Sequence, residues 1–204
     1  MEPSSTPPRH RGSPEAIREA ILTATIRLIG RGGTAAVTHR AIAAEAGVSL
    51  SSTTYHFASK DEIISEALRR VAALEIENVA EQATALLEDL HPEAFTSALV
   101  GWLAEQLEGE LLLVVRAGYH LQLEAKDRPE LREIHLEWAA AVQGVAEEVL
   151  KRAGSAQPRA DAHILATVLD GLRLEEIASP RPGAEQRLRP VVGRLLAALT
   201  SPPP

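Results

Sequence analysis

The spacing of apolar residues predicts α-helices along nearly the whole 204-residue chain. In the first long segment, Ile17, Ile21 and Leu28 recur at intervals of four and seven residues, which place side chains on one helix face. Breaks containing Gly or Pro separate such segments, and no alternating run long enough for a sheet is present. We expect nine helices, at about residues 14–31, 39–46, 50–56, 60–87, from 91–93 onward, 111–125, from 129–130 to near 154, 159–178 and 184–200.

Two of these helices are short and are separated by a glycine. Thr38 and Ser49 are favourable N-caps for the helices that follow them. Gly47 tolerates the left-handed conformation that ends a helix, and Val48 can fill the corner between two helices that cross steeply. The order helix, glycine turn, helix predicts a helix-turn-helix.

The second of the two short helices, residues 50–56, has the side-chain chemistry of a DNA reader. Its sequence LSSTTYH contains hydroxyls, one phenol and one imidazole, and no acid. These groups can donate hydrogen bonds to phosphate oxygens and base edges without repelling a polyanion. We expect this helix to enter the major groove of DNA.

The motif is part of a longer pattern. The run T-x-R-x-I-A-x-x-A-G-V-S, followed by S-T-T-Y-H-F-x-S-K-D-E-I, resembles the N-terminal signature of the tetracycline-repressor (TetR) family of transcriptional regulators over about residues 14–70. Many family members have Gly or Pro where Ser51 stands and Tyr where Thr54 stands, which leaves the base preference open. The resemblance implies a DNA-binding regulator, most commonly a repressor.

The resemblance also assigns roles to individual residues. Phosphate contacts are expected from Thr38, Ser49, Tyr55, His56 and Lys60. Base contacts are expected from Arg40, Leu50, Ser51, Ser52 and Thr54.

The charge distribution agrees with DNA binding although the net charge is −7. Residues 1–60 contain seven Lys or Arg and four Asp or Glu, a net charge of +3, whereas residues 61–204 contain fourteen and twenty-four, a net charge of −10. Only the N-terminal part would therefore be attracted to phosphate.

Composition and motifs narrow the other functional classes. The chain has no Cys, and its seven His are not at metal-ligand spacing on one helix, so we expect neither a disulfide nor a metal site. It lacks a long apolar run, a signal peptide, a nucleophile elbow and a phosphate or dinucleotide loop. We expect a cytoplasmic protein that does not associate with a membrane, binds no cofactor and is not an enzyme. The alternatives to a DNA-binding regulator are a helical interaction protein that does not bind DNA or, less favoured, an enzyme.

The predicted domain organisation is all-α. Residues 1–12 form a tail, in which Arg9 and Arg11 could reach a minor groove. Residues 13–58 form a three-helix DNA-binding domain, and residues 59–201 form a six-helix ligand-binding and dimerisation domain. Ser59 and Glu62 are spaced as a capping box at the start of the latter.

A palindromic operator is recognised by two DNA-binding domains, one on each half-site, so we expect a homodimer. The last two helices carry much apolar surface, part of which must belong to the chain's own core. The expected four-helix interface comprises Ile164, Leu165, Val168, Leu172, Leu188, Val191, Val192 and Leu195, with Leu169 and Leu199 on the same helices.

Polar and aromatic residues interrupt the apolar stripes of the central helices. Apolar walls with a few amide and phenol groups are typical of small-molecule pockets, although such residues are also ordinary core residues. In the TetR family, a ligand bound in the pocket of this domain moves the two DNA-binding domains of the dimer apart. We expect a largely apolar effector bound by Asn78, Trp102, Gln106, Tyr119, Gln122 and Trp138.

Overall fold

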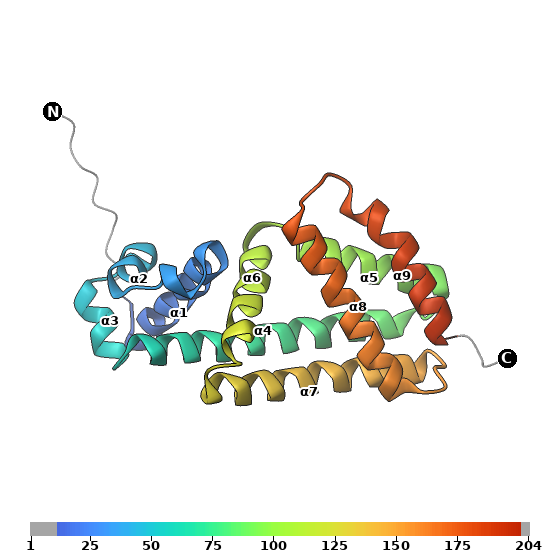
Figure 1. Ribbon diagram of the computed structural model, residues 1–204, viewed down its shortest axis with the longest axis horizontal. Coiled ribbons are helices and arrows are strands. Elements are labelled where there is room, and N and C mark those ends of the chain that lie inside the picture. The colour runs from blue at the N-terminus through green and yellow to red at the C-terminus, as the bar shows by residue number, and fades with distance from the viewer. Residues whose placement is uncertain (1–11, 201–204) are drawn as a thin grey trace. The chain divides into compact units, whose positions relative to one another are not determined.

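The computed structural model describes residues 12–200, and these residues contain nine α-helices, one short 3-10 helix and no strand. The predicted all-α fold is thus confirmed. In chain order the elements are α1 (Pro14–Gly32), η1 (Thr34–Ala36), α2 (His39–Ala46), α3 (Leu50–His56), α4 (Lys60–Glu88), α5 (Pro92–Glu105), α6 (Gly109–Glu124), α7 (Pro129–Arg152), α8 (Pro158–Ala178) and α9 (Ala184–Thr200) (Figure 1).

The chain packs as two compact units. Of the described residues, the first comprises 12–72 and 112–135, and the second 73–111 and 136–200. Helices α4, α6 and α7 therefore contribute residues to both units. The boundaries at 12/13 and 58/59 predicted from sequence stay a prediction, and most of the expected tail, with Arg9 and Arg11, lies outside the described residues.

In the first unit, α1, α2, α3 and the beginning of α4 surround one apolar core (Figure 1). Ile21, Ile42, Phe57 and Ile63 are fully or almost fully buried there. The ring of Phe57 also carries the guanidinium of Arg18 at 4.9 Å from its centroid. Burial of these side chains stabilises helices that are too short to persist alone.

Hydroxyl side chains cap the first three α-helices, two of them, Thr38 and Ser49, as predicted. The side chains of Ser13, Thr38 and Ser49 accept hydrogen bonds from backbone N–H groups of the first turns of α1, α2 and α3. The capping box before α4 differs in one detail: Ser59 Oγ accepts from the Glu62 N–H, whereas Glu62 Oε2 accepts from the Ala58 N–H instead of that of Ser59. The box is thus wider by one residue than the one predicted.

The first unit also contains most of α6 and the beginning of α7. Thr34 Oγ1 donates to Glu124 Oε1, which joins the segment after α1 to the end of α6. Arg128 pairs with Asp61 at 3.3 Å and with Glu130 at 3.0 Å. Residues from opposite ends of this unit's sequence are thus connected by polar contacts as well as by the core.

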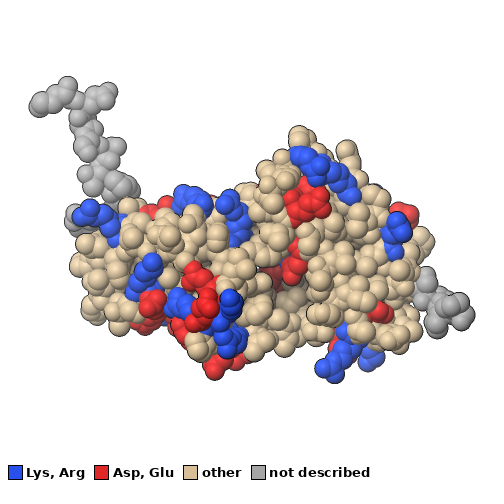
Figure 2. All heavy atoms as spheres, in the orientation of Figure 1, with Lys and Arg blue, Asp and Glu red and all other residues tan. Residues whose placement is uncertain are grey.

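In the second unit, α5 and α9 pack side by side, and α8 packs on α9 (Figure 1). Its core is built from Leu, Val and Phe side chains of α5, α8 and α9 and the ends of α4 and α7. Lys or Arg and Asp or Glu side chains adjoin over the segment that joins α8 and α9 (Figure 2). There Arg187 donates twice to the buried Glu176 and also to the backbone carbonyls of Arg181 and Pro182. The Arg187 hydrogen bonds lower the pKa of Glu176.

Across residues 12–200, no helix has both the length and the apolar character needed to cross a membrane.

Candidate nucleic-acid interface and buried polar network

The turn between α2 and α3 has the geometry that its sequence predicts. Gly47 adopts φ 66° and ψ 27°, the left-handed conformation, and its N–H donates to the Ala43 carbonyl. The Val48 N–H donates to the same carbonyl at 3.0 Å. Because a Cβ would strain this conformation, glycine lets α2 end sharply and α3 begin three residues later.

The hydroxyls at the two N-caps are placed to serve a second purpose. Thr38 Oγ1 accepts from the Ala41 N–H at 3.1 Å, and Ser49 Oγ accepts from the Ser52 N–H at 3.1 Å. A hydroxyl oxygen that accepts in a cap still carries a hydrogen that it can donate. The Thr38 cap can therefore both start a helix and donate to a phosphate oxygen. Ser49 Oγ also lies 2.8 Å from Ser51 Oγ and 2.7 Å from Ser52 Oγ, so it is available to phosphate when these two hydroxyls donate to it.

The residues expected to contact bases or phosphates are mostly exposed. Leu50 is 51% exposed and Tyr55 is 84% exposed, unusual values for large apolar and aromatic side chains. Thr54 Oγ1 donates to the Ser51 carbonyl at 3.1 Å, which leaves its lone pairs for an outside donor. Arg40, Ser51, Thr54 and Lys60 are exposed, and Ser49, Ser52 and His56 are half-buried.

Sequence reasoning missed one pair in this motif. His39, the first residue of α2, places Nδ1 3.0 Å from Oγ1 of Thr53, a fully buried residue of α3. Thr53 lies among the hydroxyl residues expected to face DNA, and only its burial distinguishes it from them. A helical-wheel assignment of α3 could have separated Thr53 from Ser52 and Thr54.

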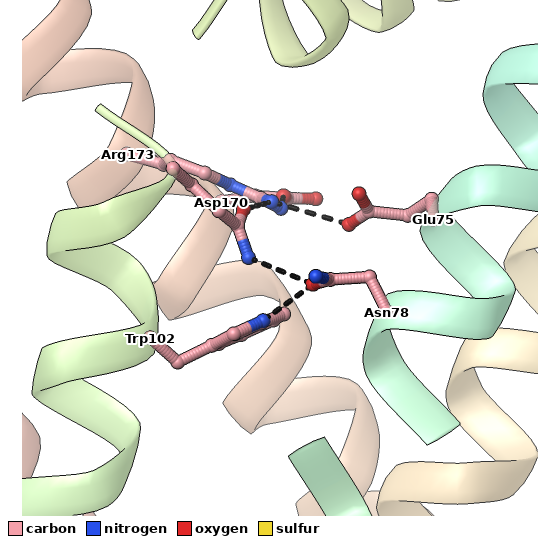
Figure 3. A network of polar contacts seen from close by, with 6 residues as sticks. Glu75, Asn78, Trp102, Asp170 and Arg173 are labelled. Atoms are coloured by element: carbon pink, nitrogen blue, oxygen red, sulfur yellow. Dashed lines mark hydrogen bonds and ion pairs between the residues drawn. The ribbon is translucent and has the colours of Figure 1, made fainter. Parts of the chain in front are cut away.

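In the second unit, three residues expected to bind a ligand do lie together (Figure 3). Trp102 Nε1 on α5 donates to Asn78 Oδ1 on α4 at 2.5 Å, and Gln106 Nε2 is 3.5 Å from the same oxygen. Gln106 is only 2% exposed. Thus one amide oxygen of α4 accepts from the indole of Trp102 on α5 and from the amide of Gln106, the residue directly after α5.

The same network includes charged residues that sequence analysis did not place there. Arg173 on α8 donates to Gln106 Oε1, to Asp170 Oδ1 and, at 3.2 Å, to Glu75 Oε1 (Figure 3). The side chains of Arg173 and Glu75 are 11% and 12% exposed. Glu75 stands in a run of acids with Glu77 and Glu81 that is typical of a solvated helix face, yet its side chain is largely buried and paired.

The other residues expected at the ligand site belong to α6 and α7. Trp138 is on α7 in the second unit, whereas Tyr119 and Gln122 are on α6 in the first. Their participation in one site stays a prediction. Among residues 12–200, no three His, Asp or Glu side chains are grouped as a metal ion would require.

The residues expected at the dimer interface divide by burial. Leu165, Leu188 and Val192 belong to the protomer's own core, as do Leu169 and Leu199. Ile164 and Val191 are 44% and 43% exposed, and Val168, Leu172 and Leu195 are half-buried. Only the exposed and the half-buried residues leave side-chain surface for a partner.

Two family matches cover most of the described chain. Residues 21–67 match the family of bacterial regulatory proteins called tetR, and residues 90–201 match the tetracyclin repressor-like, C-terminal domain. The second match alone spans more than half of the chain. No curated protein matches the chain.

Solved structures agree with these matches. The multidrug binding protein EbrR complexed with ethidium is 35% identical, with 91% of this chain and 99% of that chain covered and a TM-score of 0.64. For EbrR complexed with proflavin the values are 37%, 88%, 99% and 0.58. A TetR-family member from Streptomyces coelicolor A3 is 35% identical, with 88% and 97% coverage and a TM-score of 0.66. The chain therefore belongs to the TetR family, and it is a DNA-binding transcriptional regulator.

Proposed function

We propose that the protein represses transcription by binding, as a homodimer, to a two-fold-symmetric operator from which a small molecule releases it. The observation that carries the DNA-binding part is the exposed, acid-free surface of α3, on which Leu50 and Tyr55 have large exposed side chains. Large side chains left uncovered in a compact unit commonly mark a surface that binds a partner. Hydroxyls beside them supply donors and acceptors for base edges.

Phosphate and base contacts divide as the family resemblance implies. Lys60 is the exposed first residue of α4, so its ammonium adds to the positive end of that helix's dipole, which favours a phosphate. Arg40 is exposed on α2 and can donate two parallel hydrogen bonds to a guanine edge. The other proposed phosphate contacts are Thr38, Ser49, Tyr55 and His56, and the other proposed base contacts are Leu50, Ser51, Ser52 and Thr54.

The experiment is selection of duplexes from a random pool by the purified protein, followed by titration of the selected and a scrambled duplex at several salt concentrations. A two-fold-symmetric consensus with a salt-dependent affinity is expected. If no duplex is enriched, or if selected and scrambled duplexes bind alike, the proposed operator recognition is wrong.

Dimerisation is proposed through the uncovered apolar side chains of α8 and α9. Ile164 and Val191 are exposed although they stand on helices whose other faces form the core of the second unit. Val168 and Leu195 extend the same surface as half-buried residues. A second copy of the chain would remove these side chains from water.

The effector is proposed to bind at the network of Asn78, Trp102 and Gln106. The sequence suggested a largely apolar compound, but the network also holds two carboxylates, Glu75 and Asp170, against one guanidinium. Such a site has a net negative charge, which favours a positively charged ligand. EbrR, a relative, was solved with ethidium and with proflavin, both planar aromatic cations at neutral pH. We therefore propose an aromatic cation as the effector.

Binding would act as a population shift. A ligand that favours a conformation with low operator affinity by about 2.7 kcal/mol weakens operator binding roughly 100-fold without touching α3. Helix α4 contributes Asn78 and Glu75 to the network and, in the other unit, carries Lys60 at its first position. We therefore propose that this continuous helix transmits the effect of the bound effector to the DNA-binding surface.

Ethidium and proflavin are suitable probes, and binding is measured first without DNA because planar cations also bind duplexes. Saturable binding and a higher melting temperature are expected for the wild type. Glu75→Gln should weaken binding about tenfold or more, whereas Glu77→Gln, an exposed acid on the same helix, should not. Equal affinities for wild type and Glu75→Gln would place the cation elsewhere.

A further inference from the structure

The hydrogen bond between His39 and Thr53 joins the two helices of the helix-turn-helix. His39 is half-buried at the first position of α2, and Thr53 is completely buried in the middle of α3. Nδ1 of the imidazole and Oγ1 of the threonine are 3.0 Å apart. The bond is therefore shielded on the threonine side, where an unpaired hydroxyl oxygen would lose a water partner.

The protons in this bond can be assigned by elimination. Thr53 Oγ1 also lies 2.8 Å from the Leu50 carbonyl oxygen, which can only accept. The single hydroxyl hydrogen is thus donated to Leu50, so His39 Nδ1 must carry a hydrogen and donate to Thr53. The imidazolium also carries this hydrogen, so protonation at Nε2 leaves the bond in place.

This bond restrains the rotation of α3 about its own axis. The caps fix where α3 begins, but Thr53 faces inward while Leu50, Ser51, Thr54 and Tyr55 are exposed. Side chains reach about 5–6 Å from a helix axis, so a rotation of roughly 20° would move their tips by about 2 Å. Hydrogen bonds to base edges tolerate only a few tenths of an ångström.

We propose that His39 is a positioning residue for operator recognition: through its Nδ1 donor to Thr53 it holds α3 at the angle at which its exposed side chains match the bases. The proposal rests on the proposed function. It assigns to His39 a role in discrimination between sequences and not a contact with DNA. Loss of the bond should thus reduce operator affinity while affinity for unrelated DNA stays the same.

The test uses full-length protein and the duplex that the wild type selects from a random pool. The measured quantity is the ratio of the Kd for a scrambled duplex to the Kd for the selected one. His39→Ala and Thr53→Val should each lower this ratio roughly three- to tenfold, the value of one hydrogen bond. Because both remove the same bond, the double variant should lower it no further than the stronger single change.

Two conservative variants separate positioning from direct contact. An Asn amide nitrogen occupies about the place of the histidine Nδ1, whereas a Gln amide nitrogen reaches the place of Nε2. His39→Asn should therefore keep the ratio within about twofold, and His39→Gln should lose it as His39→Ala does. If His39→Gln kept the ratio and His39→Asn lost it, Nε2 of His39 would contact DNA, and the proposal would be overturned.

The remaining outcomes are equally decisive. A lower melting temperature of His39→Ala with an unchanged ratio would make the bond merely structural and would overturn the inference while operator recognition stands. If the wild type selects no duplex, the proposed function itself fails, and the inference fails with it. Circular dichroism of each variant confirms that the ratio is measured on folded protein.

Discussion

Gly30 of α1 lies directly against the backbone of Leu113 in α6. A Cβ placed on Gly30 would come within 2.3 Å of the Leu113 carbonyl oxygen and within 2.9 Å of its Cα. Both residues belong to the first compact unit, and Gly30 is buried. Helices approach this closely only where one of them lacks a side chain, so the contact fixes the distance between α1 and α6 inside the DNA-binding unit.

Substitution of this glycine should be costly. In Gly30→Ala the methyl group meets backbone, which cannot move aside as a flexible side chain could, so α1 and α6 must separate. We expect a loss of about 1–3 kcal/mol in the free energy of unfolding, measured by urea denaturation. Gly144→Ala is the control, because that helical glycine is exposed and nothing lies within 4 Å of its added Cβ. It should be neutral or stabilising by roughly 0.5–1 kcal/mol. Equal stabilities of the two variants would contradict the close approach.

The ion pair between Glu176 and Arg187 predicts how stability depends on pH. The hydrogen bonds from Arg187 lower the pKa of Glu176 in the folded protein relative to the unfolded chain. A carboxyl with a lowered folded-state pKa stabilises the fold above its unfolded pKa of about 4.3, and this contribution is lost as pH falls through the folded value. Thermal unfolding of wild type and Glu176→Gln should therefore differ at about pH 7, and the difference should shrink progressively as the pH falls below about 4.3.

A second acid provides the control for this experiment. Glu148 is exposed and pairs with Arg152 at 2.8 Å along one face of α7. The Arg152 hydrogen bond also lowers the pKa of Glu148, but exposed pairs contribute little to stability because water and salt screen them. Glu148→Gln should leave the melting temperature nearly unchanged at both pH values. A Glu176→Gln variant that behaved in the same way would show that the corner between α8 and α9 does not depend on its ion pair.

The features that sequence predicts well are local ones. Helix starts at Ser13, Thr38 and Ser49 and the end at Gly47 follow from chemistry within a few residues, and the helix ends lie within about two residues of those expected. The pairing of Glu75 with Arg173 joins residues 98 positions apart. No local pattern distinguishes Glu75 from a solvated acid, so only the three-dimensional structure reveals its partner on α8.

The same limit applies to the apolar residues of α9. Val191 and Val192 are adjacent and have the same side chain, yet Val192 is completely buried and Val191 is 43% exposed. Periodicity alone shows that one face is apolar, but the face assigned to the protomer's core depends on where α5 and α8 pack. The sequence thus predicted which helices carry apolar surface but could not separate exposed apolar residues from core residues.

This difference in burial leads to a prediction about assembly. A charge on the exposed apolar surface of α8 or α9 should prevent dimerisation; the variants are Ile164→Glu on α8 and Val191→Glu on α9. Sedimentation should show that both are monomers. Their melting temperature should fall only by the amount that loss of the dimer explains. Val192→Glu should instead unfold the second unit, because an unpaired carboxylate in that core costs several kcal/mol. Val191→Glu protein that stays dimeric at micromolar concentration would exclude this surface as the interface.

The last prediction separates phosphate contact from base contact on the DNA-binding surface. Lys60 and Arg40 are both exposed cations, one at the start of α4 and the other in the first turn of α2. Lys60→Ala should weaken selected and scrambled duplexes alike and reduce the slope of log Kd against log salt by about one, because one fewer counterion is released. Arg40→Ala should cost on the order of 1–3 kcal/mol, mainly for duplexes that carry the preferred base pair at one position. Titrations of the selected duplex and its single-base variants measure both effects. If Arg40→Ala weakened every duplex equally, Arg40 would be a phosphate contact and another residue of α2 or α3 would read that base pair.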